Sequence, residues 1–247
     1  MQIAVASIKD SRALRYRKPD AGNLLRTSLR VKTFFALFVL LVVALAIYPF
    51  LNPPENGDTV TGLPWQIEIL PDGTSQVFGL HIGSSRLSDA FDIHGDDMEL
   101  AIIAATDEIG KLEMYYGHYQ AGLLSGKLVL HTGSSEQNIK RWRENAAKSE
   151  YMASGQAKKY ILSDDDSVQV MQEVITGITF LPAVNLDEAV ILARFGEPEK
   201  HIVQPEATHY LYPAKGLDIV LYEEAKEVLQ YVSPDAFQQL TRPLLAH

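Results

Sequence analysis

Residues 177–232 read GITFLPAVNLDEAVILARFGEPEKHIVQPEATHYLYPAKGLDIVLYEEAKEVLQYV, and this stretch decides the predicted fold class. A β-rich run at 177–181 precedes a segment whose apolar residues recur at helical spacing, and Gly196 with Pro198 ends that helix. Three β-rich runs then follow, separated by turn-rich segments, at 209–212, 217–222 and 228–232. The pattern predicts an α+β unit of one strand, one helix and a three-stranded antiparallel meander.

The same arrangement is found earlier in the chain. A strand is predicted at 76–82, and a short helix with Leu87, Ala90 and Phe91 on one face ends at Gly95. Further β-rich runs follow at 99–105, 112–116 and 123–131. The predicted fold is therefore α+β, with two helix-plus-antiparallel-meander units at 63–133 and 177–247 and connecting helices at 134–176.

An apolar run precedes both units. Residues 34–51 read FFALFVLLVVALAIYPFL, eighteen residues without a charge. At ~1.5 Å per helical residue the run spans roughly 27 Å, close to the ~30 Å hydrocarbon core of a bilayer. The run from Phe34 to Leu51 therefore predicts one N-terminal transmembrane helix as the contact with the membrane, followed by a polar linker at 52–62.

Charge predicts the orientation of this helix. Residues 1–33 form a basic arm with eight basic and two acidic side chains, whereas the remaining residues carry a net charge of −15. The positive-inside rule then places the arm in the cytoplasm and the rest in the periplasm, as a single-pass inner-membrane protein with a signal-anchor. A cleaved signal peptide is the alternative, although the basic leader and the apolar run are both long for one.

A resemblance follows from the second unit. The segment Phe195-Gly196-Glu197-Pro198, followed by Tyr210-Leu211-Tyr212-Pro213 and a meander, resembles the small α+β unit of the BamE/SmpA lipoproteins. Tandem copies of such a unit build the β-lactamase inhibitor proteins, and the soluble part is similar to an uncharacterised proteobacterial family of inner-membrane-anchored envelope proteins. The resemblance implies a non-catalytic binding or scaffolding role. The chain has no cysteine, so the lipid attachment of those lipoproteins does not carry over.

Catalytic and metal signatures are missing from the sequence. The absence of cysteine excludes thiol nucleophiles, disulfides and cysteine-ligated metals. The seven histidines form no HxH or HExxH motif, and Asp164-Asp165-Asp166 lacks the ligand spacing of a calcium loop. Neither Gly-Ser-Ser segment matches G-x-S-x-G, and no phosphate-binding loop is present. We therefore predict no catalytic residues, no metal and no cofactor.

Aromatic residues are the best candidates for binding. Tyrosines cluster in one strand of the first unit and recur in the second, where Tyr210 and Tyr212 share a face because alternate strand positions do. Basic residues surround Trp142, which we interpret as a solvated helix face or, if functional, as a contact for an acidic protein or lipid. The predicted binding residues are Tyr115, Tyr116, Tyr119, Tyr210, Tyr212 and Trp142. Tyrosine is also simply a good strand former, which is the structural alternative.

These features favour a non-enzymatic accessory factor that binds another envelope protein and does not bind nucleic acid. One alternative is an envelope hydrolase with paired carboxylates drawn from Asp187, Glu188 or Asp218. Another is a sensor of a lipid or small ligand, which requires a cavity between sheet and helices.

Overall fold

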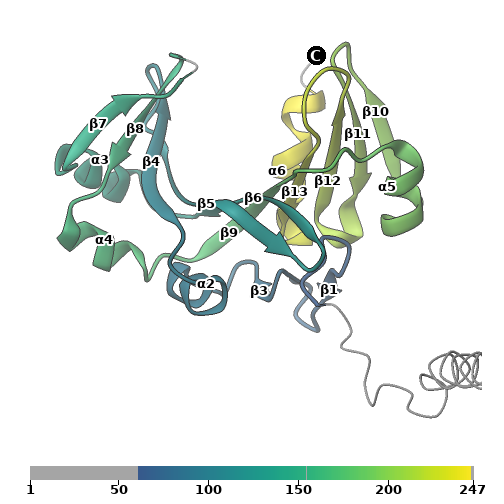
Figure 1. Cartoon of the computed structure of the whole chain (residues 1–247), viewed down its shortest axis with the longest axis horizontal. Coiled ribbons are helices and arrows are strands. Elements are labelled where there is room, and N and C mark those ends of the chain that lie inside the picture. Colours follow the sequence, from purple (N-terminus) through teal and green to yellow (C-terminus); the bar gives the residue numbers. More distant parts are fainter. Residues whose placement is uncertain (1–60, 154, 246–247) are drawn as a thin grey trace, which may run out of the picture. The chain divides into compact units, whose positions relative to one another are not determined.

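The computed structural model describes residues 61–153 and 155–245, which belong to the compact unit Val60–His247. Figure 1 shows that antiparallel strands dominate this unit. A small sheet has the order β1-β2-β3, and a ten-stranded sheet has the order β10-β11-β12-β13-β9-β6-β5-β4-β8-β7. The strands are β1 (Glu68–Ile69), β2 (Ser75–Val77), β3 (Leu80–His81), β4 (Glu99–Ala105), β5 (Lys111–Ala121), β6 (Leu124–Thr132), β7 (Lys148–Tyr151), β8 (Ala157–Ile161), β9 (Ile175–Pro182), β10 (Lys200–Val203), β11 (Ala207–Tyr212), β12 (Leu217–Tyr222) and β13 (Val228–Val232).

The helices of the described residues are short. They are α2 (Leu87–His94), α3 (Glu136–Glu144), α4 (Asp164–Val170), α5 (Glu188–Phe195) and α6 (Gln238–Thr241), with single 3₁₀ turns at Pro213–Lys215, Pro234–Ala236 and Pro243–Leu245. Side-chain caps start three of them: Ser135 accepts a hydrogen bond from the Asn138 backbone in α3, and Ser163 and Asp187 cap α4 and α5 in the same way.

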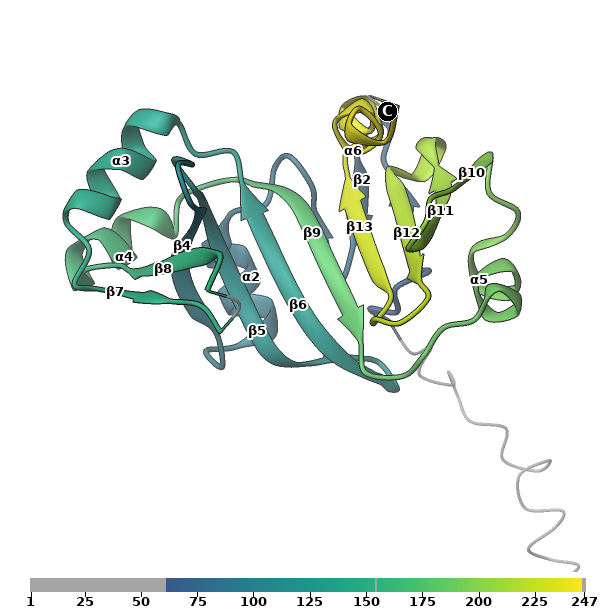
Figure 2. The ribbon, with the colours of Figure 1, turned by 90° about the horizontal axis from the view of Figure 1, so that it is seen from above.

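The two predicted units are not separate folds, and the predicted fold class needs correction. One meander, β4-β5-β6, runs from one side of the large sheet to its middle, and the other, β10-β11-β12-β13, runs inward from the opposite edge. Strand β9 pairs with both β6 and β13 and joins the two halves into one continuous sheet (Figure 2). The described part of the chain is therefore mostly β, and hydrogen bonding through β9 merges the strands of both halves into one sheet.

The membrane-anchored architecture is contradicted as well. Among residues 61–153 and 155–245, no helix is long and apolar enough to cross a membrane. The longest of these helices, α3, has nine residues, or ~14 Å at ~1.5 Å per residue, against a ~30 Å hydrocarbon core. The predicted arm, the predicted span at 34–51 and most of the linker lie outside the described residues. The predicted single-pass signal-anchor and the inner-membrane, periplasmic localisation are therefore contradicted by the helices of the described residues.

The helix that precedes each meander ends in the same way. Helices α2 and α5 both have eight residues, and both are followed by a glycine with positive φ: Gly95 at 85° and Gly196 at 82°. A positive φ favours glycine because it has no Cβ. The next strand, β4 or β10, begins at Glu99 or Lys200, four positions beyond its glycine. The two segments are thus local copies of each other.

The main core lies on one face of the large sheet. Six buried side chains stand opposite one another in register across six strands: Tyr116, Leu128, Phe180, Leu229, Ile219 and Tyr210. Residues of α2, α3, α4 and α5 pack against this face in the same hydrophobic cluster, together with residues of the small sheet. Burying each such side chain contributes roughly 1.5–3 kcal/mol, so this row stabilises both halves together.

A second, smaller core lies on the opposite face. Leu211, Val232 and Phe237 are buried together, with Leu240 of α6 packed against them. Figures 1 and 2 show α6 on the other side of β11–β13 from α5. Around Leu211 and Val232 the sheet is therefore covered on both faces.

Candidate functional site

The structure buries five of the six predicted binding residues. Tyr116 and Trp142 are 2% exposed, and Tyr119, Tyr210 and Tyr212 are buried as well. Only Tyr115 is half-exposed. Tyr210 and Tyr212 do share a face, as predicted, but it is the face that packs in the main core. These five side chains therefore form no exposed surface, since alternation shows which residues share a face and not whether that face is covered.

Two of the buried tyrosines have matched structural roles. The Tyr116 hydroxyl donates to the carbonyl oxygens of Ala90 (3.2 Å) and Gly95 (3.4 Å), and the Tyr212 hydroxyl donates to that of Gly196 (2.8 Å). Each tyrosine thus pairs with the glycine that ends the helix of its own half. Burial raises the pKa of both phenols to about 12, so both remain protonated donors.

Trp142 lies on the buried face of α3 and packs in the main core. Its neighbour Arg141 lies over the indole ring, with the guanidinium 5.6 Å from the ring centroid. Arg143 donates to the backbone oxygens of Glu108 and Ile109 and to the Tyr160 hydroxyl. These contacts fix Arg143 as a structural side chain, and Trp142 itself is buried and presents no exposed binding face.

Within residues 61–153 and 155–245, no helix packs on one face of the sheet over β4, β5, β6 and β9. Half-exposed residues stand in register across β5, β6, β9 and β13: Tyr115, Val129, Thr179 and Gln230. Glu113 and His131 form the adjacent pair on the same face. We call these six residues the open face. The same row continues into Asp218 and Leu211, which are buried on the side of the sheet where α6 packs.

A polar chain crosses the open face. The Glu113 carboxylate lies 3.3 Å from Nδ1 of His131, and Nε2 of His131 lies 2.9 Å from the Thr179 hydroxyl oxygen. The order carboxylate, imidazole, hydroxyl is that of a hydrolytic triad. The backbone N–H groups of β6 and β9, however, are directed into ladders on both sides, where they cannot form an oxyanion hole. The arrangement better suits a fixed hydrogen-bonding surface.

The open face is hollowed where it meets α6. A cavity of about 690 Å³ is lined by His131, Thr179 and Gln230 from the sheet and by Gln239 and Leu240 from α6. Lys111 stands at its rim and is exposed. The hollow offers amide, hydroxyl and imidazole groups next to an apolar wall.

The carboxylates proposed for hydrolysis do not meet. Asp187 caps α5 by accepting a hydrogen bond from the Val190 backbone (2.8 Å), and Glu188 lies in the exposed first turn. Asp218 is buried beside Nδ1 of His209 at 2.9 Å, on the face opposite to α5. In the described part of the chain, no group of three or more histidine or acidic side chains is placed to hold a metal.

Most of the open face has no signal in the sequence. Val129, Thr179, Gln230 and Glu113 carry no motif, and only their alternation with buried neighbours could have indicated a shared surface. Tyr119, in contrast, is a predicted binding residue, and the structure buries it. Register shifts between Tyr116 and Tyr119, so a β-bulge returns Tyr119 to the buried face instead of the open one. No residue pattern in this strand indicates that bulge.

Comparisons with known proteins provide no relative. The chain matches no protein-family model, no curated protein and no solved structure. The resemblance to the BamE/SmpA unit therefore stays a prediction from the sequence.

Proposed function

We propose that the domain is a non-catalytic binding module that docks another protein on the open face. The observation that carries this proposal is the register of Tyr115, Val129, Thr179 and Gln230, half-exposed across four neighbouring strands, while the opposite face is packed under helices. A sheet with one uncovered face provides a rigid, extended surface. Tyr115 and Val129 stand opposite each other on this face with polar side chains around them, and tyrosine is enriched in the centres of protein interfaces.

Charge at the rim favours an acidic partner. Lys111 and Lys127 are exposed on the open-face side of β5 and β6, and within the described residues neither lysine has an ion-pair partner. Glu99, in contrast, is already paired with Lys159. The partner surface that fits is therefore an apolar patch flanked by carboxylates, which would also accelerate association through electrostatic steering.

Site-specific photocrosslinking in cells that express the full chain tests this proposal. A photoreactive phenylalanine at Val129 or Thr179 should give one discrete crosslinked protein. The matched control is Val168, 74% exposed on α4, whose helix packs on the opposite face. The charge reversal Lys127→Glu should reduce the Val129 crosslink several-fold. Equal crosslinking from Val129 and Val168, or none from the open face, would contradict the proposal.

A further inference from the structure

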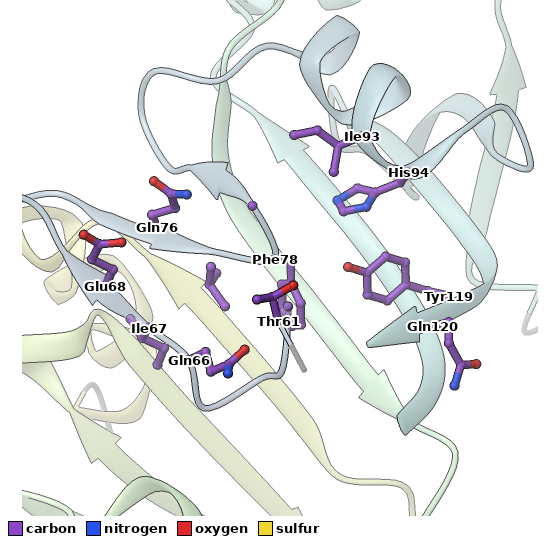
Figure 3. Close-up of a pocket in the computed structure, with 13 residues that line it drawn as sticks. Thr61, Gln66, Ile67, Glu68, Gln76, Phe78, Ile93, His94, Tyr119 and Gln120 are labelled. Atoms are coloured by element: carbon purple, nitrogen blue, oxygen red, sulfur yellow. The ribbon is translucent and has the colours of Figure 1, made fainter. Parts of the chain in front are cut away.

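A second hollow lies on the opposite side of the large sheet. It is bounded by the small sheet β1–β3, the last turn of α2 and the end of β5, and its volume is about 740 Å³ (Figure 3). Small-molecule sites span roughly 300–1,000 Å³. Its wall contains Phe78, Ile93, His94 and Tyr119, which Figure 3 shows around one opening.

The β-bulge in β5 places Tyr119 in this hollow. Tyr116 pairs with Leu128 and Tyr119 with Gly126, so three steps along β5 match two along β6. Without the extra residue, Tyr119 would face the other side of the sheet. Bulges next to sites commonly redirect a side chain in this way. The redirected phenol has no hydrogen-bond partner among the described residues, and burial raises its pKa, so it keeps its proton for donation.

His94 is a second unpaired polar group in the wall. Its ring stands edge-on to Tyr119, with ring centroids 5.0 Å apart. Nε2 is fully buried and has no hydrogen-bond partner in the described part of the chain. Burial also lowers the pKa of the imidazole, which is therefore neutral at pH 7 and offers one donor and one acceptor.

The second half of the molecule shows what packing alone requires at this position. His94 is the last residue of α2 before Gly95, and Phe195 is the last residue of α5 before Gly196. His94 stands against Tyr116 (centroids 5.8 Å apart) as Phe195 stands against Tyr212 (6.3 Å). An apolar ring therefore suffices for this packing. The imidazole at 94 adds a polar function that no described residue uses.

Phe78 shapes the floor of the hollow at a conformational cost. It has φ 54° and Gly79 has φ 78° in the two-residue turn between β2 and β3, where Asn or Gly is usual at the first position. Edge-on and tilted contacts with Tyr119, Tyr231 and Phe180 (centroids 5.5–5.7 Å) hold the ring. Strained residues of this kind persist mainly at ligand sites and switches.

The remaining lining residues define the ligand chemistry. Gln76 contributes an amide, and the amides of Gln66 and Gln120 lie in the wall while bonded to Leu63 and Gly122. Glu68 contributes the one carboxylate, and no lysine or arginine lines the hollow among the described residues. Such a wall disfavours anions. Amides beside aromatic rings suit a ligand that alternates hydroxyl groups with apolar C–H faces.

We propose that this hollow binds an uncharged, hydroxyl-rich small molecule of the size of a mono- or disaccharide. The Tyr119 hydroxyl hydrogen-bonds one of its hydroxyl groups, and the His94 ring turns toward the hollow so that its buried Nε2 reaches another. The rings of Phe78 and Tyr119 contact its apolar face. This site is separate from the protein-docking surface, because the two lie on opposite faces of the sheet.

Ligand titration of the full-length chain, with isotope-labelled histidine and tyrosine observed by NMR, tests the proposal. The neutral probes are glucose, N-acetylglucosamine and maltose, and glucose 6-phosphate is the anionic control. At least one neutral probe should shift the His94 and Tyr119 resonances saturably, and more tightly than the phosphate ester. No saturable shift with any neutral probe, or tighter binding of the phosphate ester, overturns the proposal.

Three variants locate the effect. Tyr119→Phe removes only the hydroxyl and should weaken binding roughly five- to tenfold, the value of one neutral hydrogen bond. His94→Phe copies the arrangement at Phe195, so it should fold and lose a similar factor. Tyr151→Phe, 68% exposed on β7 and outside both proposed sites, should bind as the unaltered chain does. Unchanged affinity in Tyr119→Phe and His94→Phe, with folding confirmed by thermal unfolding, would also overturn the proposal.

Discussion

The two halves of the sheet start from the same local design and end with different surfaces. In each half an eight-residue helix ends at a glycine, a strand begins four positions later, and a tyrosine hydroxyl reaches a carbonyl at the helix end. In the second half, α6 packs on the far face of the sheet, and the last residue of α5 is the apolar Phe195. In the first half no described helix covers the far face, and His94 and Tyr119 line a hollow on the opposite, helix-packed side.

This difference separates packing from function within one chain. The second half shows which residues the helix–glycine–strand arrangement needs in order to pack. Where the first half departs from it, at His94, at the bulge before Tyr119 and at the uncovered row from Tyr115 to Thr179, packing gives no reason for the departure. Both proposed sites lie at these departures.

The largest expected effect is in the second half, at Gly216. A Cβ at this position would lie 1.9 Å from the Val232 carbonyl oxygen, and the backbone φ of 64° disfavours any side chain. Gly216→Ala should therefore cost about 4 kcal/mol or more, or prevent folding. Gly117→Ala is the control, because the nearest atom to its Cβ would be a Tyr115 ring carbon at an ordinary contact distance of 3.4 Å. Denaturant unfolding measures both, and equal stability of the two variants would contradict the structure.

Phe180 tests whether the halves unfold together. Its buried ring lies on β9, in the core row that joins them, and Phe180→Ala should cost roughly 3–5 kcal/mol. Because one sheet links both halves, unfolding should remain a single transition whose midpoint falls. Calorimetry with far-UV circular dichroism checks this result. Two separated transitions, each assigned to one half, would instead support two independent units.

Alkaline pH should destabilise both halves through their matched tyrosines. An unfolded tyrosine ionises near pH 10, whereas Tyr116 and Tyr212 have pKa values of about 12 in the fold. Their contribution is fully present below pH 10 and is lost as pH rises through 12. Unfolding free energies at pH 8, 10 and 11 should fall steeply above pH 10. The double variant Tyr116→Phe/Tyr212→Phe should lose less over the same interval.

At neutral pH each of these hydroxyls should contribute about 1 kcal/mol. Tyr212 donates to one carbonyl at 2.8 Å, whereas Tyr116 shares its proton between carbonyls at 3.2 and 3.4 Å. Tyr212→Phe should therefore cost at least as much as Tyr116→Phe in denaturant unfolding. A much larger cost for Tyr116→Phe would show that the two hydroxyls differ in their contribution to stability although their geometry is similar.

The smallest effect concerns His94. Burial lowers its pKa in the fold, so the unfolded chain binds the proton more readily and stability falls as pH drops below about 6.5. His94→Phe should remove this part of the acid sensitivity. The free energies of unfolding of the two proteins should diverge by less than about 1.4 kcal/mol per pH unit. Thermal unfolding between pH 7.5 and 5 measures the difference. Identical pH profiles for both proteins would show that His94 is not buried in its neutral form.

Several elements could be predicted closely because their signals are local. The strands at 99–105, 217–222 and 228–232 have the predicted bounds, and Gly95 and Gly196 end their helices. Strand β10 was missed because it is short and its side chains are mostly exposed, so it lacks an apolar pattern. The predicted strand at 76–82 is instead a hairpin, since Phe78 adopts a turn conformation that phenylalanine rarely does.

The sites were predicted less well because they depend on contacts between distant segments. The tyrosine pattern correctly grouped Tyr210 with Tyr212 but could not show that α5 packs near that face. Similarly, the merging of both meanders through β9 involves strands separated by many residues, which no local pattern encodes.

The sequence by itself determined where helices end and strands begin, because glycine conformation, capping side chains and two-residue alternation act within a few residues. It also determined which side chains share a face of a strand. Only the tertiary structure decided which face is covered, because that depends on where α6 and the helices of the opposite side pack. The bulge that turns Tyr119 toward His94 was decided in the same way, by pairing of β5 with β6.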